Sequence, residues 1–228
     1  MRNHLIFTLV APMGSFGDLA GHELRGSYFW PGRSALLGLV GGALGVRRDD
    51  KSGQATLTVW KTAVSVLSVG IVWQDFHTIQ TVPSARIKRP ETRQEALSAL
   101  RRADNGVITR RNYCNDCVFG VAMWGGDIQL LEAALRKPVF VPYLGRKNCP
   151  LSAPMSPKIV SADTSIEALT QVILPPFLNI DTKRPKLVIT DENIPGGWTE
   201  VRWDEPLDRA AWHFGQRRVR VLGTEFNS

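Results

Sequence analysis

The sequence has few cysteines and no long apolar run, and both absences narrow the class of protein. Its 228 residues include three cysteines, an odd number at irregular spacing, which does not form the disulfide framework of a secreted domain. No stretch approaches the roughly 20 apolar residues that a membrane span requires. The first residues indicate a strand rather than a charged segment followed by an apolar signal core. We therefore expect reduced thiols and a cytoplasmic protein without membrane contact.

The chain also lacks the motifs of the common nucleotide-binding and hydrolytic sites. Neither G-x-x-x-x-G-K-[ST] nor G-x-G-x-x-G occurs, and there is no H-E-x-x-H or Ser/His/Asp order. Cys114 and Cys117 form a single C-x-x-C without the second pair that zinc needs, and Cys149 stands alone. If residues 113–124 form one strand, the first two thiols point to opposite faces. The sequence predicts neither a cofactor nor a metal.

Positive charge, in contrast, is abundant and concentrated in one segment. Lys and Arg number 28 against 21 Asp and Glu, which gives a net charge of +7 and a pI near 9.7. Five of those seven net charges lie between Arg86 and Arg111. The segment has few large apolar side chains, so it predicts a protruding basic insertion that binds nucleic acid, with a merely solvated loop as the alternative. Its cations are Arg86, Lys88, Arg89, Arg93, Arg101, Arg102, Arg110 and Arg111.

The order of apolar runs predicts an α+β fold with the β-α-β-β-α-β order of ferredoxin-like domains. Residues 1–155 would form this domain, interrupted by the basic insertion at about 79–110, and residues 156–228 would form a small β-rich appendage. In the domain we expect strands at 3–10, 55–73 (or a hairpin there), 117–124 and 139–144, with helices from Pro31 and after Asp127. In the appendage we expect a helix near 163–174 and strands at 186–190, 198–203 and 217–222.

Three glycine-containing loops lie at predicted strand or helix boundaries, where free backbone N–H groups can face an anion. They are MGSFG at 13–17, WPGRS at 30–34 and LGRKN at 144–148. Each loop alone is typical of a simple turn. The second contains Arg33, and the third contains Arg146 and Lys147 with no acid beside them, which favours phosphate as the anion.

His77 is a candidate for acid–base chemistry. It lies two residues after Asp75 and could act as a general base in metal-independent RNA cleavage. A histidine that only fixes a loop by hydrogen bonding explains the same pattern.

Five segments in collinear order carry a family resemblance: LVAPMGSFGD, FWPGRSALLGLVGGALGVRRDD, DFHT, TRRNYCNDCVFGVAMW and PVFVPYLGRKNCPLSAP. Over roughly residues 1–155 the chain resembles the CasD subunits of type I-E CRISPR Cascade complexes. That family belongs to the RAMP proteins, so the resemblance implies a ferredoxin-like domain related to RNA-recognition motifs, with a protruding thumb. It also implies a subunit that holds the 5′ handle of mature CRISPR RNA and contacts the CasC backbone and the CasA large subunit, while CasE processes the precursor.

The resemblance assigns RNA-binding roles to positions of this chain. Arg111 and Tyr113 match the family's T-x-R-x-Y pattern at the base of the thumb, although Cys-Asn-Asp-Cys follows here where the family usually has Leu-Cys-Asp-Ala. Lys88, Arg89 and Arg110 join the set by composition only. The remaining matched positions are Met13, Gly14, Ser15 and Phe16 of the first loop, Arg33 and Ser34 of the second, His77 of DFHT, and Arg146 and Lys147 of LGRKN.

The expected function is therefore a non-catalytic RNA-binding subunit for antiviral defence, with target DNA near the thumb. A related subunit of type I-C systems cuts precursor RNA, so the alternative is a metal-independent endoribonuclease that uses His77 or Tyr113 with a neighbouring lysine. A third alternative is a scaffold that contacts only other proteins.

Overall fold

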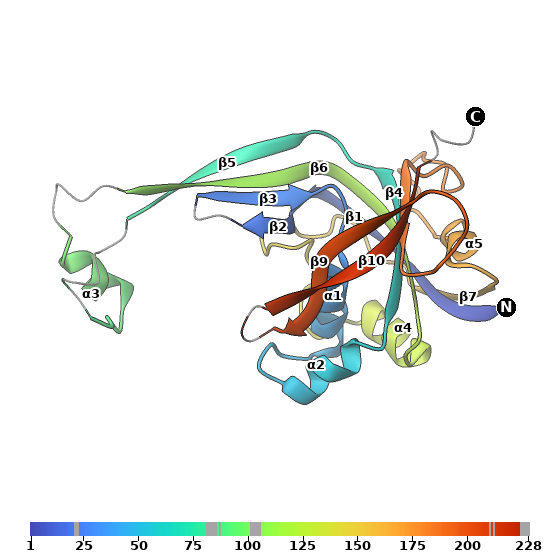
Figure 1. The fold of residues 1–228 in the computed structure, drawn as a ribbon, viewed down its shortest axis with the longest axis horizontal. Helices are drawn as coiled ribbons and strands as arrows, with labels where there is room; N and C mark the ends of the chain where they lie inside the picture. Colours follow the sequence, from blue (N-terminus) through green and yellow to red (C-terminus); the bar gives the residue numbers. More distant parts are fainter. Residues whose placement is uncertain are drawn as a thin grey trace.

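One sheet runs through the body of the molecule (Figure 1). A long arm projects from it, formed by two paired strands at residues 72–79 and 107–114. The computed structural model describes residues 1–20, 23–80, 86, 88–100, 106–209, 211 and 213–223. The helices are α1 (Arg33–Leu44), α2 (Lys51–Leu57), α3 (Arg93–Ser98), α4 (Ile128–Arg136) and α5 (Ser165–Leu169). The strands are β1 (Arg2–Gly14), β2 (Phe16–Ala20), β3 (Leu24–Tyr28), β4 (Lys61–Ser68), β5 (Val72–Ile79), β6 (Val107–Trp124), β7 (Lys158–Ala162), β8 (Leu187–Thr190), β9 (Trp198–Asp208) and β10 (His213–Gly223).

Four strands at the centre of the sheet pair in the order β7-β1-β6-β4, and each is antiparallel to its neighbour. Side chains of β1 alternate between two cores. Leu5, Phe7 and Leu9 pack into the cluster that contains α1 and α4, whereas Ile6 and Val10 pack into the cluster that contains α5. Burial on both faces explains why these strands are continuous apolar runs in the sequence. The mixed helix-and-sheet fold predicted from those runs is thus observed.

Capping residues fix the start of one predicted helix and the end of another. The Asp127 carboxylate accepts a hydrogen bond from the Leu130 amide at 3.0 Å, which caps α4. α1 ends at Gly45, whose φ of 79° lies in the left-handed region that favours glycine. Within the described ranges, no helix is both long enough and apolar enough to cross a membrane.

The prediction of a strand at 139–144 is wrong. The edge position beside β1 is occupied instead by β7. Residues 139–142 form no strand, and only an isolated bridge joins Tyr143 to Pro150. Pro138 and Pro142 explain the difference, because proline lacks the N–H that a strand inside a sheet must donate. The segment 55–57 also differs from the prediction, since it ends α2 rather than beginning a strand.

The sheet continues across the predicted boundary at residue 155. β7 pairs with β1, and β8 pairs with both β4 and β10, so strands from residues 156–228 extend the same sheet. The hairpin strands β9 and β10 are longer than the expected 198–203 and 217–222, whereas α5 is shorter than the expected 163–174.

A buried ion network attaches the β9–β10 hairpin to α1. The Arg33 amide donates to Asp204 Oδ2 at 2.7 Å, and Arg33 Nε lies 2.7 Å from Glu205 Oε2. Arg217 Nε donates to Asp204 Oδ1 at 2.6 Å, and its Nη1 donates to Asp191. Asp204 therefore supplies the negative charge at the N-terminus of α1 and connects the Arg33 amide to the mostly buried Arg217 guanidinium.

We expect Asp204→Ala to lower the free energy of unfolding by about 3–5 kcal/mol, because it removes a carboxylate from the mostly buried Arg217 guanidinium and leaves the Arg33 amide without its acceptor. Urea denaturation followed by circular dichroism measures the change. Asp181→Ala is the matched control: Asp181 lies 3.8 Å from Arg184 in an exposed pair, and its loss should change stability by less than about 1 kcal/mol. Equal effects of the two variants would contradict a structural role for the network.

His4 gives the fold a pH dependence. Its side chain is buried in β1, and burial together with the neighbouring Arg2 lowers the pKa of His4 below 6.5. In the unfolded chain His4 therefore becomes protonated near pH 6.5, whereas in the folded chain it becomes protonated only at lower pH. We expect stability to fall as pH drops below about 6.5, with a slope of at most about 1.4 kcal/mol per pH unit from this group.

Denaturation at pH 7.5, 6.5 and 5.5 tests this expectation. His4→Gln should lose this part of the slope, and His213→Gln, at an exposed position of β10, should keep it. An unchanged slope in His4→Gln would show that other groups cause the pH dependence.

Candidate nucleic-acid interface

The arm is a continuation of the core sheet. Residues 118–124 of β6 pair with β1 and β4, and residues 107–114 of the same strand pair with β5 over its whole length. α3 lies at the far end, where the Thr92 side chain caps it and Arg93 Nη2 donates to Gln80 O at 2.6 Å. The predicted insertion at 79–110 thus falls within this arm.

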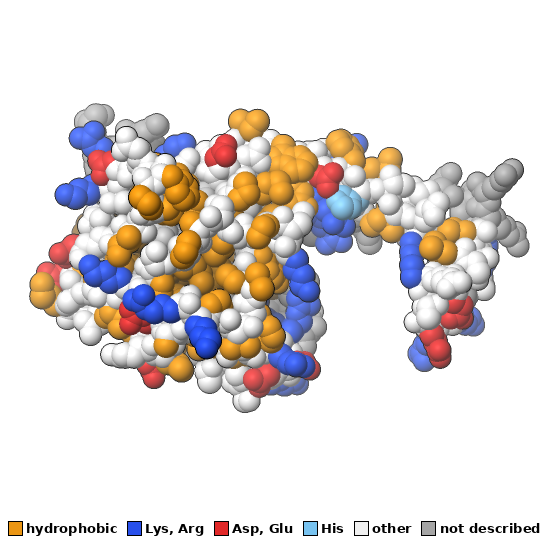
Figure 2. Space-filling model, turned by 180° about the vertical axis from the view of Figure 1, so that it is seen from behind, with side chains coloured by type: hydrophobic (Ala, Val, Ile, Leu, Met, Phe, Trp, Pro, Cys, Tyr) orange, Lys and Arg blue, Asp and Glu red, His pale blue; other side chains and the backbone are white. Residues whose placement is uncertain are grey.

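The predicted cations of the insertion that the structure describes are distributed along the arm. Lys88 and Arg89 are exposed near α3, and Arg110 is exposed on β6. Arg101 and Arg102 lie outside the described residues. Figure 2 shows a hollow between the body and the far end of the arm, with Lys and Arg side chains along both of its sides. A chain of phosphates would meet positive charge on both sides of this hollow.

Arg110 and Arg111 face opposite sides of the arm, because neighbours on a strand alternate. Arg110 stands in register with Phe76 of β5 and Leu24 of β3, and its guanidinium carbon lies 6.0 Å from the Phe76 ring centre. Arg111 stands in register with Asp75 and Arg25. Sequence reasoning missed Arg25, because only the parallel pairing of β3 with β6 brings it beside Arg111.

Tyr113 lies at the base of the arm and is 1% exposed. Its ring stacks on Trp73 with centroids 5.1 Å apart, and the Arg146 guanidinium carbon lies 4.7 Å from its centre. Asn148 Nδ2 donates to the Tyr113 hydroxyl at 3.1 Å. A ring held in this way cannot stack on a base of RNA, so its observed contacts hold the 144–148 loop against the arm.

The loops at 13–17 and 144–148 meet at this point, but the first offers few free amides. Gly145 has a φ of 80°, and a Cβ there would overlap the Ser15 carbonyl oxygen. The Ser15 amide donates to Leu144 O at 3.1 Å, and the Phe16 amide donates to Ser27 Oγ at 2.9 Å.

The predicted MGSFG loop is mostly strand. Met13 and Gly14 end β1 and Phe16 begins β2, while Gly14, Ser15 and Phe16 are buried and Met13 is half-buried. The expectation of free amides at Ser15 and Phe16 therefore needs correction, because protein acceptors already satisfy both.

Arg33 and Ser34 also differ from the expectation of a phosphate site. Arg33 is 4% exposed and its side chain bonds to carboxylates and to the carbonyls of Thr58 and Trp60. The Ser34 carbonyl accepts from Arg209 Nη2 at 2.6 Å. The anion at the start of α1 is the protein's own Asp204, so we leave both residues out of the interface.

Four cations remain around the base of the arm: Arg25, Arg111, Arg146 and Lys147, which we call the arm-base cluster. None of them forms an ion pair with an acid among the residues that the structure describes. Arg146 Nη1 is shielded from solvent and has no hydrogen-bond acceptor among the described residues. The cluster therefore carries uncompensated charge at a junction of rigid elements, which suits it to an anion.

His77 lies on the same side of β5 as Asp75. Its Nε2 is 2.6 Å from Asp75 Oδ2, and both side chains are partly exposed on the arm. Register places His77 opposite Thr109 and Asp75 opposite Arg111. An Asp-oriented imidazole of this kind can hold a hydrogen bond to a ligand or accept a proton from one.

The thiols have no ligand geometry for a metal. A φ of 49° at Asp116 interrupts the alternation of β6, so Cys114 and Cys117 both lie in the α1 core cluster, contrary to the expected opposite faces. Burial raises the pKa of Cys117 to about 12, which keeps that thiol protonated at neutral pH. Within the described ranges, no three His, Cys, Asp or Glu side chains gather as a metal site would require.

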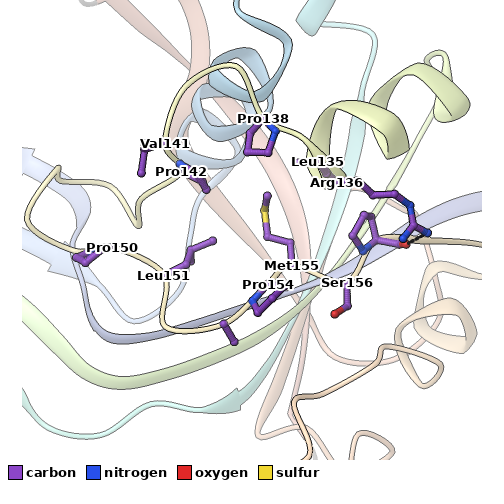
Figure 3. A pocket seen from close by; sticks show the side chains of 12 residues that line it. Leu135, Arg136, Pro138, Val141, Pro142, Pro150, Leu151, Pro154, Met155 and Ser156 are labelled. Carbon is purple, nitrogen blue, oxygen red and sulfur yellow. Dashed lines mark hydrogen bonds between the residues drawn. The ribbon is translucent and has the colours of Figure 1, made fainter.

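A pocket of about 530 Å³ lies beside the end of α4 (Figure 3). Met155 projects into its middle, with Pro142 and Leu151 on one side and Leu135 and Arg136 on the other. The Arg136 Nη2 already donates to Glu132 and to Pro157 O, each at 2.8 Å. An apolar, proline-lined wall with one satisfied cation does not suit a nucleic acid.

Solved structures of one class, the CRISPR-associated proteins, share this fold. A chain of a structure described as CRISPR RNA-guided surveillance complex superposes with a TM-score of 0.72 at 27% identity, covering 96% of this chain and 89% of that one. A structure described as crystal structure of Cas protein superposes with a TM-score of 0.60 at 22% identity, over 97% and 96% of the two chains, and supports the fold.

The sequence identifies the family within that class. Residues 4–220 match the family model described as CRISPR-associated protein (Cas_Cas5). The CRISPR system Cascade subunit CasD of Escherichia coli (strain K12) is 33% identical in an alignment of 173 residues that covers 68% of this chain and 70% of that protein. The chain belongs to the Cas5 family, which confirms the resemblance found in the sequence.

Proposed function

We propose that this chain is a non-catalytic subunit of a type I-E Cascade complex and holds the 5′ handle of the mature CRISPR RNA. The arm-base cluster is the observation that carries the proposal. Its cations have no carboxylate partner in the described ranges, and they stand on β3, on β6 and on the loop that Gly145 fixes against Ser15. Phosphates of a single RNA strand would supply the missing negative charge.

The fold supports the same proposal. The order β7-β1-β6-β4, with α1 and α4 in the two crossovers, is the order expected of a ferredoxin-like RAMP domain, and on this proposal the arm would be the thumb of that family. His77, which lies on the Arg111 side of the arm, would contact the strand where it leaves the cluster. Lys88 and Arg89 would lie near target DNA, and Arg110 would add positive charge on the opposite side of the arm. In the complex the chain would join a CasC backbone subunit to the CasA large subunit.

We expect Arg111→Ala and Arg146→Ala each to weaken binding of a handle-containing RNA by roughly tenfold, because each removes a charged contact to phosphate. Each variant should also reduce the slope of log affinity against log salt by about 0.7. Filter binding of the purified chain at several salt concentrations measures both quantities.

Arg184→Ala is the matched control, because Arg184 is exposed but lies far along the chain from the arm, in a loose pair with Asp181. It should leave affinity and slope near the values of the unaltered chain. Equal losses in all three variants would indicate nonspecific attraction. Unchanged affinity in the two test variants would favour a scaffold that contacts only proteins.

An endoribonuclease is the second candidate function, and the Asp75–His77 pair is the observation that favours it. Labelled precursor RNA incubated with the chain in EDTA distinguishes the two. On our proposal the RNA stays intact. Cleavage at one defined position that disappears in His77→Ala would favour the nuclease. Tyr113→Phe is a less informative variant, because the Tyr113 hydroxyl is bonded to Asn148 in a buried stack.

A further inference from the structure

The two faces of the β9–β10 hairpin differ sharply in character. On the inward face Arg202 and Asp204 are buried, and Arg202 packs over the Tyr28 ring at 3.6 Å. On the outward face Val201 and Trp203 stand at alternate positions and are 51% and 53% exposed. Leu207, which lies beyond a register shift in the pairing with β10, is 70% exposed. Large apolar side chains exposed so close together on one strand form a patch that a monomer normally covers.

The edge of β9 is open as well. β9 is the last strand in its part of the sheet, and in the described part of the chain it pairs only with β10. Its outer N–H and C=O groups therefore form an unpaired row that another strand could join. Pro206 has no N–H, which confines such pairing to residues 199–205.

The charges of the hairpin indicate what kind of strand would fit. Three of the four acids of β9 pair with arginines of the protein: Glu200 lies 2.7 Å from Arg202, Asp204 binds Arg217, and Glu205 lies 2.7 Å from Arg33. The fourth, Asp208 at the end of the strand, accepts a hydrogen bond from the Ala211 amide at 2.9 Å. Arg218 stands opposite Val201, is exposed, and has no ion pair among the residues described. Arg220, opposite Thr199, lies on the same face and donates to Thr199 Oγ1 at 2.9 Å. The outward face therefore combines apolar side chains with two positive charges, of which Arg218 has no ion pair among the described residues.

We infer that residues 199–205 of β9 receive an extended segment of another subunit, which adds to the sheet as a further strand. The segment presents apolar side chains at alternate positions beside Val201 and Trp203, and a carboxylate toward Arg218. Trp and Arg are the residues enriched at the centres of protein interfaces. Branched side chains such as Val201 and Leu207 offer no flat surface to a base, and a second copy of this chain would bring another Arg218 instead of a carboxylate.

This inference rests on the proposed membership of a multi-subunit complex, but it does not depend on RNA contacts at the arm-base cluster. The hairpin and the arm are different elements, joined to the sheet through different strands. The two surfaces can therefore be altered separately.

Hydrogen exchange on the unaltered chain tests the inference directly. The chain is coexpressed with the other subunits of its own CRISPR system and a guide RNA, and the purified complex is compared with the chain alone. Amides of 199–205 should exchange at least tenfold more slowly in the complex. Exchange at the same rate in both samples overturns the inference, as does protection by guide RNA without the other subunits.

Two variants test the side chains. Trp203→Glu and Arg218→Glu should each lower incorporation into the complex at least tenfold, while RNA affinity of the isolated chain is unchanged. Phe177→Glu and Arg184→Glu are the matched controls, since both residues are exposed and neither lies in the hairpin. Normal incorporation of the two hairpin variants contradicts the inference. Failure of the unaltered chain to join any complex contradicts instead the proposed function.

Discussion

The arrangement of the candidate site depends on one strand, β6, which passes without a break from the centre of the sheet into the arm. Its eighteen residues pair with β1 and β4 in the body and with β3 and β5 further out. Side chains on the arm are therefore positioned by the core itself rather than by a flexible connection. The Tyr113 stack adds the 144–148 loop to the same strand, so that cations from three separate segments share one rigid base.

Arginine has two opposite uses in this protein. Inside the body, Arg33, Arg202 and Arg217 have carboxylate partners. The Arg33–Glu205 pair holds the C-terminal hairpin against α1, and the other two pairs lie within the hairpin. Around the arm base, Arg111 and Arg146 lack such partners among the described residues. Burying an unpaired guanidinium is costly, so the internal arginines require their acids, whereas the outer ones tolerate the absence because solvent or an anion compensates them.

Sequence periodicity predicted the elements that local patterns determine, and failed where distant residues decide. The helix after Asp127 and the end of α1 at Gly45 follow from capping chemistry within a few residues. The sequence predicted Arg33 as a phosphate ligand because its partner Asp204 is 171 positions away, and no residue near Arg33 in the sequence indicates that contact. The Phe16 amide looked free for the same reason, since its acceptor Ser27 arrives only when β2 and β3 pair. Arg146 was correctly singled out as a cation without a nearby acid.

The pairing of β1 has a consequence for synthesis on the ribosome. Leu5 pairs with Met123 on one side and with Ile159 on the other, so the first strand emerges long before either neighbour exists. At about 5–20 residues per second, β1 waits on the order of ten seconds or more with its apolar side chains uncovered. A nascent chain of this design depends on early shielding of its first strand, and its yield in cells should respond to chaperone supply more than its final stability suggests.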